Sequence, residues 1–195
     1  MRAFRRALPL AFACLLLSLD SALAQVWTVL DGSQIRFTFL QQGSPTEGRF
    51  RDFTANITFY PDQLTKSLVD VRIDTGSIDT GHKDRDTLLR SAAFFDVDHW
   101  PTAHFESHRL SHLKGETYEA TGELTIRGVT KPVVLPFTVT IGDQPGAADR
   151  LLAVAKGELT ISRLDYGIGQ GEWAATKTVG DPVVMKFDLR ASRLR

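Results

Sequence analysis

The spacing that most suggests chemistry in this sequence is a set of histidines four residues apart, His104, His108 and His112. On a helix, that spacing would place three imidazole rings on one face, where they could bind a zinc ion. Pro101 before them and the alternation around Phe105 instead predict a strand. On a strand, His104 and His108 share a face but lie about 13 Å apart, which is too far for one ion. We therefore predict solvent-facing histidines and no metal site.

Catalytic motifs are absent from the sequence. It contains neither the G-x-S-x-G segment of many hydrolases nor the H-E-x-x-H segment of zinc proteases. Asp96, Val97 and Asp98 resemble part of a calcium-binding loop, but the glycine and the final glutamate of that loop are missing. We therefore predict a protein that is not an enzyme and needs no cofactor. A small lipid-modifying activity is the catalytic alternative.

Two arginine–aspartate combinations could recognise a polar group on a ligand. Arg85 is followed by Asp86, and Arg163 is followed two residues later by Asp165. Because a guanidinium group binds oxygen acceptors such as those of a pyrophosphate or a quinone, both arginines are candidate head-group ligands. The alternative, which we favour, is that each pair forms a salt bridge that ties a loop to the rim of the fold.

The segments that must position these side chains alternate between apolar and polar residues, which is the period of a half-buried strand. A strand begins at Phe105, and alternation also covers residues 27–29, 35–39, 53–59, 69–73, 118–126, 133–141, 151–161 and 183–189. The turn residues Asp31, Gly32 and Ser33 between the first two segments predict a hairpin. Residues 82–91 predict one short helix, with Thr80 as its cap.

Eight or nine strands without a βαβ rhythm predict an all-β fold. Because the strands are long and follow one another closely, we expect a lipocalin-like, antiparallel eight-stranded barrel with one short connecting helix. Such a barrel either fills its interior with side chains or holds a small ligand, and the sequence leaves both alternatives open. A membrane-embedded barrel is disfavoured because charges lie along candidate strand faces, at Arg49, Arg72 and Asp74.

The first 24 residues have the three-part pattern of a secretory signal peptide. Three arginines lie within residues 1–6, an apolar run covers residues 7–19, and the segment ends in A-x-A at Ala24. We therefore predict a signal peptide over residues 1–24 and one mature domain over residues 25–195 that begins at Gln25. The one cysteine, Cys14, would be removed with the signal peptide.

The composition is that of a globular protein, with 43% hydrophobic and 24% charged residues. The 23 basic and 23 acidic side chains cancel, and removal of residues 1–24 with three arginines and one aspartate would leave a net charge of −2. No basic surface therefore points to a nucleic acid as partner. Because no run of about 18 apolar residues is present, we expect no membrane-spanning helix and no stable membrane insertion. The sequence leaves a homodimer open.

Motifs along residues 26–194 resemble those of a known family. In chain order they are W-x3-D-x-S-x3-F from Trp27, DVRIDTGSIDTG from Asp70, RD from Arg85, FFD from Phe94, P-x3-F-x-S from Pro101, GELTIRGVTKP from Gly122, R-x-D-Y-G from Arg163 and VGD from Val179. Together these segments are similar to the YceI-like family of periplasmic polyisoprenoid-binding proteins. The combination is specific, whereas each segment alone would be weak.

The resemblance implies a lipocalin-like barrel around an elongated apolar pocket. It implies that the pocket takes an isoprenoid, an isoprenoid quinone or another long-chain lipid, which the protein sequesters or carries in the bacterial periplasm. It supplies no catalytic residue. A filled barrel that acts as a structural or interaction module is the alternative.

Apolar side chains on the alternating strands, in the predicted helix and in the loops are the candidate ligand contacts. We predict that the ligand is bound by Phe37, Phe39, Phe53, Ile57, Leu88, Phe94, Phe105, Phe137 and Trp173. Alternation does not tell which face points inward, and a slip of one residue would exchange the two faces. The segment from Leu164 to Pro182 has no strand pattern, and loops of that length are often functional. We predict that Trp173 acts there as a lid, with a plug in one end of the core as the alternative.

Overall fold

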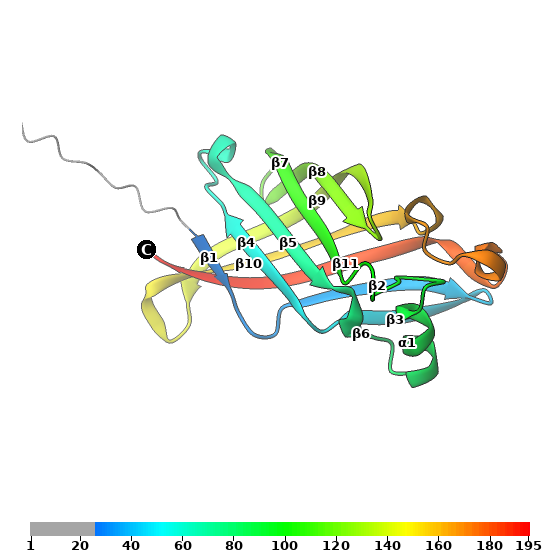
Figure 1. Ribbon diagram of the computed structural model, residues 1–195. Helices are drawn as coiled ribbons and strands as arrows, with labels where there is room; N and C mark the ends of the chain where they lie inside the picture. Colours follow the sequence, from blue (N-terminus) through cyan, green and yellow to red (C-terminus); the bar gives the residue numbers. More distant parts are fainter. Residues whose placement is uncertain (1–25) are drawn as a thin grey trace, which may run out of the picture.

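The computed structural model describes residues 26–195 (Figure 1). The predicted signal peptide, its cleavage site and Cys14 therefore lie outside the described residues. The described strands are β1 (Val26–Val29), β2 (Gln34–Gln41), β3 (Ser44–Phe50), β4 (Phe53–Thr58), β5 (Leu68–Asp74), β6 (Ile78–Asp79), β7 (Thr102–Lys114), β8 (Thr117–Ile126), β9 (Val129–Gln144), β10 (Ala147–Ser162) and β11 (Val179–Leu194). The one α-helix of residues 26–195 is α1 (Lys83–Arg90), and short 3-10 turns cover Leu64–Lys66, Thr75–Ser77, Leu164–Tyr166 and Gly171–Ala174.

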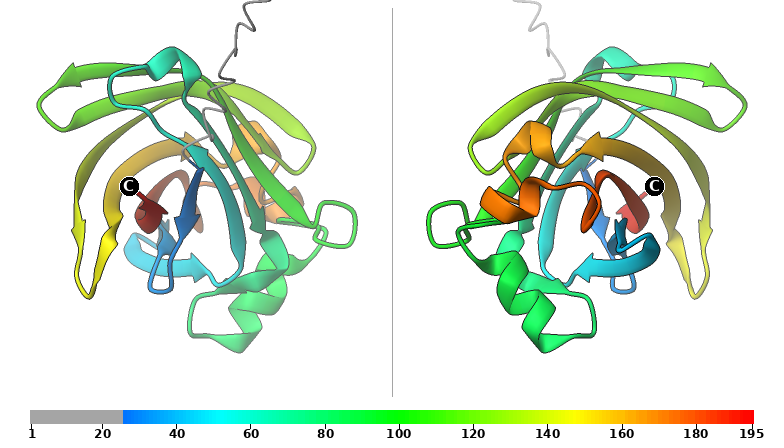
Figure 2. Two further views of the ribbon diagram at one scale, coloured as in Figure 1. Left: turned by 90° about the vertical axis from the view of Figure 1, so that its left-hand side faces the viewer. Right: turned by 90° about the vertical axis from the view of Figure 1, so that its right-hand side faces the viewer.

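The strands close into a barrel, which confirms the predicted fold class. Antiparallel pairs connect β4, β5, β7, β8, β9, β10 and β11 in that order, and β1 pairs with both β4 and β11. These eight strands form the ring that is viewed from its two ends in Figure 2. β2, β3 and β6 extend the sheet beside the other half of β11. Closure leaves the barrel wall with an inner and an outer face.

The predicted hairpin over residues 27–39 is wrong. β1 pairs with the end of β11, at Thr28 opposite Ser192, whereas β2 pairs farther back along β11, at Ile35 opposite Phe187. β1 and β2 therefore run in the same direction along one partner strand, and residues 30–33 connect them. The Ser33 hydroxyl links this connection to β11. It donates to the Leu30 carbonyl and accepts from the backbone N–H of residue 190. A turn-forming sequence does not by itself reverse the chain.

The predicted short helix is confirmed as α1, but its predicted cap is not. His82 holds the position before the helix and makes no side-chain capping bond. Thr80 instead donates its hydroxyl to the carboxylate of Asp86, which also accepts from the Thr80 backbone N–H. The buried Asp86 thus fixes the segment that leads into α1.

The long segment without predicted strand pattern is shorter than expected, because β11 begins at Val179 rather than after Pro182. The pairing between β11 and β2 is irregular between Val179 and Val183, and this irregularity hides the alternation in the sequence. The remaining segment, residues 163–178, we call the mouth loop. It lies at the same end of the barrel as α1, opposite the end that holds β1 and the C-terminus (Figure 1).

The core lies inside the barrel and follows the period of the strands. β8 shows the pattern most clearly, because Tyr118, Ala120, Leu124 and Ile126 are buried and the residues between them are more exposed. Gly122 belongs to the same inward set and faces a bulge in β7, where an added Cβ would lie 2.1 Å from the Glu106 carbonyl oxygen. Only glycine fits at that crossing of β7 and β8.

Candidate ligand-binding site

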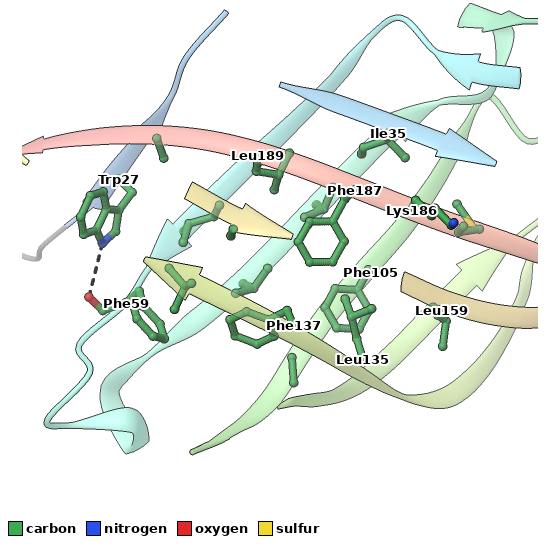
Figure 3. A pocket seen from close by; sticks show the side chains of 18 of the residues that line it. Trp27, Ile35, Phe59, Phe105, Leu135, Phe137, Leu159, Lys186, Phe187 and Leu189 are labelled. Carbon is green, nitrogen blue, oxygen red and sulfur yellow. Dashed lines mark hydrogen bonds between the residues drawn. The ribbon is translucent and has the colours of Figure 1, made fainter. Parts of the chain in front are cut away.

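A cavity of about 140 Å³ lies inside the barrel, and we call it the inner chamber (Figure 3). Its surface is formed by apolar atoms from every strand of the ring. Phe105, Leu135, Phe137, Leu159 and Phe187 are among the side chains that line it. Most of these residues lie on strands where polar neighbours point to the outside, so the closed sheet gathers the apolar set around one axis.

A second cavity of about 60 Å³, the middle chamber, adjoins the first. The two chambers share the side chains of Ile73, Leu124 and Met185 as common walls. Phe37 and Phe50 line the middle chamber, and their rings lie 5.3 Å apart between centroids. The middle chamber thus continues the apolar lumen toward the end of the barrel that carries α1.

A third hollow of about 280 Å³, the mouth, adjoins the middle chamber. The middle chamber and the mouth share Phe39, Leu89, Phe94 and Val179. Several polar side chains gather here, since Gln41, His82, Asp84 and Arg85 line the mouth together with apolar residues. The three hollows therefore lie in series, from an apolar inner chamber to a mouth with polar groups.

The opposite end of the lumen is closed by aromatic side chains. The Trp27 indole donates a hydrogen bond of 3.3 Å to the Phe59 carbonyl, and the Arg193 guanidinium lies 5.0 Å above the Trp27 ring. The ring centroids of Phe59 and Tyr118 are 5.3 Å apart, and those of Tyr118 and Phe137 are 5.8 Å apart. These contacts fix the aromatic side chains at the end of the lumen that lies away from the mouth.

Arg163 holds the mouth loop through hydrogen bonds from its buried side chain. Its guanidinium is almost fully buried and donates to four backbone carbonyls, at residues 168, 173, 179 and 180. Burial lowers the pKa of Arg163, and the nearby charge of Asp181 opposes that change. The shift does not discharge the group, because an arginine remains protonated in proteins. Arg163 therefore holds the loop through charge-assisted hydrogen bonds.

Glycine is required where the mouth loop passes over Arg163. Gly169 has φ +85°, and an added Cβ would lie 2.0 Å from Arg163 Nη1. The loop is also tied to its neighbours, because the backbone N–H groups of Gly169 and Gln170 donate to the Ala93 carbonyl. Arg127 adds bonds from its guanidinium to the carbonyls of residues 92 and 167. The backbone of this loop is held from two sides.

Neither predicted arginine–aspartate salt bridge forms. Asp165 pairs with Lys131 instead of Arg163. Arg85 donates to the Thr80 hydroxyl and carbonyl and to the Gln41 side-chain oxygen, not to Asp86. The arginines do tie loops to the rim, but through neutral oxygens. Arg85 lines the mouth, whereas Arg163 lies in the wall of the middle chamber.

Eight of the nine predicted ligand contacts lie along the three hollows. Phe37, Phe39, Ile57, Leu88, Phe94, Phe105, Phe137 and Trp173 line the inner chamber, the middle chamber or the mouth. Phe53 does not. It packs against the core and lines another hollow, of about 890 Å³, between residues 29–33 and the start of β4. This hollow exists because β4 pairs with β1 only near its end, at Ile57 and Thr58.

Several residues of the lumen were missed by the sequence reasoning. The main ones are Trp27, Phe59, Met185 and Phe187. The last two share the alternation of residues 183–189 with Leu189, so the same signal that selected Phe37 could have found them. Phe59 belongs to the alternation of residues 53–59 and could have been found with Ile57, whereas Trp27 lies at a strand start where alternation is short.

The three histidines spaced four residues apart do not line any of the three hollows. His108 and His112 are exposed, whereas His104 is half-buried and its Nε2 lies 2.8 Å from a carboxylate oxygen of Asp70. Asp70, His104 and Glu106 are close enough together to hold a metal ion. Asp70 is already paired with His104 and with Arg72, at 3.5 Å. We therefore assign no metal site to this cluster.

The calcium-like segment has a structural partner. Asp96 has φ +52° and accepts a hydrogen bond of 2.8 Å from His99, with Arg127 at 3.7 Å. The hydrogen bond from His99 and the charges around it lower the pKa of Asp96, and the same bond raises the pKa of His99. The carboxylate thus stabilises the turn after α1.

Comparison with known proteins identifies the family that this chain resembles. The family model described as YceI-like domain matches residues 27–191. A UPF0312 protein of Pseudomonas aeruginosa is 40% identical over 122 residues, which are 62% of this chain and 62% of that relative's length. A UPF0312 protein of Serratia proteamaculans is 37% identical over 166 residues, 83% of this chain and 85% of the relative.

Solved structures share the fold. BcnA of Burkholderia cenocepacia is 33% identical, with a TM-score of 0.73 over 81% of this chain and 95% of that chain. A polyisoprenoid binding domain from Saccharophagus degradans is 18% identical, with a TM-score of 0.64 over 88% of this chain and 99% of that chain. At 18% identity the second likeness concerns the fold alone. Within residues 26–195, no helix has the length and apolar character needed to cross a membrane.

Proposed function

The chain belongs to the YceI-like family, and from that premise we propose that it is a periplasmic binding protein that sequesters or carries an isoprenoid or a similar lipid. The lipid tail lies in the inner and middle chambers. The head group lies at the mouth, near Gln41 and Arg85. The proposal includes no catalytic step.

The inner chamber is the observation that carries this proposal. It lies inside the barrel, its surface is apolar, and aromatic rings pack together at its far end. Water gains little in such a space, because a buried water needs two to four polar partners. A hydrocarbon gains about 0.8 kcal/mol for each CH2 that it buries. The lumen therefore favours a lipid tail over water and over polar metabolites.

The shape of the lumen supports a chain-like ligand rather than a compact one. The chambers adjoin end to end and share only a few wall residues. The Saccharophagus degradans domain is described as binding polyisoprenoid, but its likeness to this chain concerns the fold alone. The proposal of an isoprenoid thus depends on the lumen of this chain and on its family.

Export to the periplasm is the second part of the proposal. It is supported by the signal-peptide pattern of residues 1–24 and by a sequence from residue 25 onward that has no cysteine. A protein outside the inner membrane meets lipids in transit between membranes. A lumen that shields an apolar tail from water suits that task.

Mass spectrometry of an organic extract from the exported protein tests lipid binding. We expect a prenyl lipid at a stoichiometry near one per protein. Phe137→Ala, which changes the wall of the inner chamber, should retain less lipid than the natural protein. Phe53→Ala is the matched control outside the chambers and should retain as much as the natural protein. An extract without lipid, together with delipidated protein that fails to bind farnesol, would favour the filled-barrel alternative.

A further inference from the structure

We propose that Gly48 and Gly157 are positioning residues that keep the lumen open for a lipid tail, because each lets the ring of a phenylalanine on the next strand lie against the barrel wall. This inference rests on the proposed lipid-binding function and deepens it. A hollow barrel and a filled barrel share the same strand pattern, and these two glycines help to make this barrel hollow.

Gly48 lies on β3 directly opposite Phe37 on β2, and both residues are buried. A Cβ added at position 48 would lie 2.3 Å from Cζ of Phe37, and 2.8 and 2.9 Å from its two Cε atoms. These distances are shorter than van der Waals contact, and the nearest atoms all belong to this one ring. Phe37 can therefore lie over residue 48 only because that residue has no side chain.

Gly157 repeats this arrangement at the inner chamber. It lies on β10 opposite Phe187 on β11, and its neighbours at even spacing, Ala155 and Leu159, line the same chamber as Phe187 (Figure 3). An added Cβ would lie 2.6 Å from Cε1 and 2.7 Å from Cζ of Phe187. The Pro136 carbonyl oxygen would also be close, at 2.5 Å, so the approach of β9 is a second reason for glycine here. The position on β3 is therefore the cleaner one for a test.

The backbone conformation explains neither glycine. Nine glycines of residues 26–195 have positive φ, whereas Gly48 and Gly157 lie within strands and do not. Glycine inside a strand is unfavourable, because it orders a flexible backbone and offers no side chain to pack. An aromatic ring that covers the glycine from the neighbouring strand compensates for that loss. The ring thus accounts for glycine at both positions, alone on β3 and together with the approach of β9 on β10.

A side chain at position 48 would push the Phe37 ring away from the wall. The rings of Phe39 and Phe50 flank it, with centroids 6.1 and 5.3 Å away, and the free space beside it is the middle chamber that it already lines. Because the middle chamber adjoins both the mouth and the inner chamber, a ring displaced into it would narrow the lumen. A residue larger than glycine should therefore make this barrel more like a filled one.

Prenol binding by variants of the delipidated exported protein tests this role. Geranylgeraniol is supplied in detergent micelles over a range of concentrations, and bound prenol is measured by mass spectrometry after removal of the micelles. We expect Gly48→Ala to bind about tenfold more weakly than the natural protein, because the overpacked ring moves into the lumen. Gly142→Ala on β9 is the matched control. A Cβ added there meets no atom within 4 Å, so binding should be unchanged.

A second substitution separates displacement of the ring from a general loss of structure. Phe37→Leu in the Gly48→Ala background removes the ring and should restore binding to within about threefold of Phe37→Leu alone. Gly157→Ala with and without Phe187→Leu repeats the comparison at the inner chamber. Melting temperatures establish that each variant is folded. A single variant that folds only when leucine replaces the phenylalanine would show the same contact through its stability.

The outcomes separate this inference from the function on which it rests. Unchanged binding in folded Gly48→Ala and Gly157→Ala would overturn the role of the glycines and leave lipid binding in place. A loss that persists after the ring is removed, or a failure to fold in single and double variants alike, would also overturn it, because the glycines would then serve strand packing. Failure of the natural protein to bind geranylgeraniol would overturn the proposed function and this inference with it.

Discussion

Arg163 is a buried cation that is stabilised by hydrogen bonds to backbone oxygens. Its four carbonyl partners come from the mouth loop and from the start of β11. Among the described residues, no carboxylate lies within ion-pair distance of it; the charge of Asp181 acts only at longer range. A buried charge is tolerated when hydrogen bonds replace its hydration. The side chain thus couples the loop that carries Trp173 to the barrel wall.

Replacement of Arg163 should therefore be costly. Hydrogen bonds to charged groups contribute about 1.5 to 3 kcal/mol each, so we expect Arg163→Gln to lower the free energy of unfolding by at least about 3 kcal/mol. Arg163→Lys keeps the charge but offers one nitrogen for four carbonyls, and its loss should be intermediate. Arg49→Gln, which breaks an exposed pair with Asp79, is the control and should cost less than about 1 kcal/mol. Denaturant unfolding measures all three, and equal losses for Arg163 and Arg49 would contradict this role.

The pair of Asp96 and His99 gives a residue-level prediction for pH. The lowered pKa of Asp96 means that its contribution to stability is lost as the pH falls through that value. The raised pKa of His99 means that its contribution is lost as the pH rises through that value. The pair is therefore strongest between these two pKa values. NMR titration should find the pKa of His99 lower in Asp96→Asn and lowered less in Asp98→Asn, because Asp98 contributes only its charge and Asp96 also accepts the hydrogen bond. A His99 pKa that Asp96→Asn leaves in place would refute the assignment.

Single residues also mark the limit of alternation as a guide. Phe53 and Ile57 lie on the same strand at even spacing, and alternation assigns them one face. Both side chains pack against the core, but Ile57 lines the inner chamber and Phe53 lines the hollow beside residues 29–33. The difference arises because the neighbour of β4 changes along its length: β1 covers Ile57, and no strand of the described chain pairs with that edge at Phe53. A pattern within one strand carries no information about where its neighbour ends.

At the scale of elements, most strands could be predicted and their partners could not. Residues 118–126 and 133–141 alternate strictly and form β8 and most of β9. The turn chemistry at residues 31–33 is equally clear, yet it produces a step along β11 rather than a hairpin. The difference lies in β11, which is long enough to pair with β1 and β2 in succession. That pairing is set by residues far along the chain, as Thr28 opposite Ser192 and Gln41 opposite Val179 show.

The mouth loop carries the prediction that belongs to this scale. Trp173 lines the mouth, is only half-buried, and its ring centroid lies 5.6 Å from that of Phe94. Its backbone is held by Arg163, so motion of the side chain is the simplest way to open the mouth. We expect Trp173→Ala to speed lipid release with little loss of melting temperature. An unchanged off-rate together with a large loss of stability would identify Trp173 as a plug.

At the scale of the whole molecule, an all-β barrel was accessible from the sequence, but its empty lumen was not. A filled barrel and a hollow barrel have the same alternation, because both place apolar residues inside. The volume that remains depends on how side chains such as Phe37, Phe105 and Met185 divide the interior. Those positions follow from the register between strands, which is set only when the ring closes.

The last prediction concerns where the mature molecule begins. β1 starts at Val26 and closes the ring through its pairs with β4 and β11, and Trp27 caps the far end of the lumen. Cleavage after Ala24 would leave Gln25 ahead of this strand and keep the closure whole, whereas cleavage a few residues later would remove Trp27. We therefore expect the exported protein to begin at Gln25, with 171 of the 195 residues. Intact mass spectrometry measures this directly. A retained N-terminus, or a diacylglycerol mass on Cys14, would refute processing at Ala24.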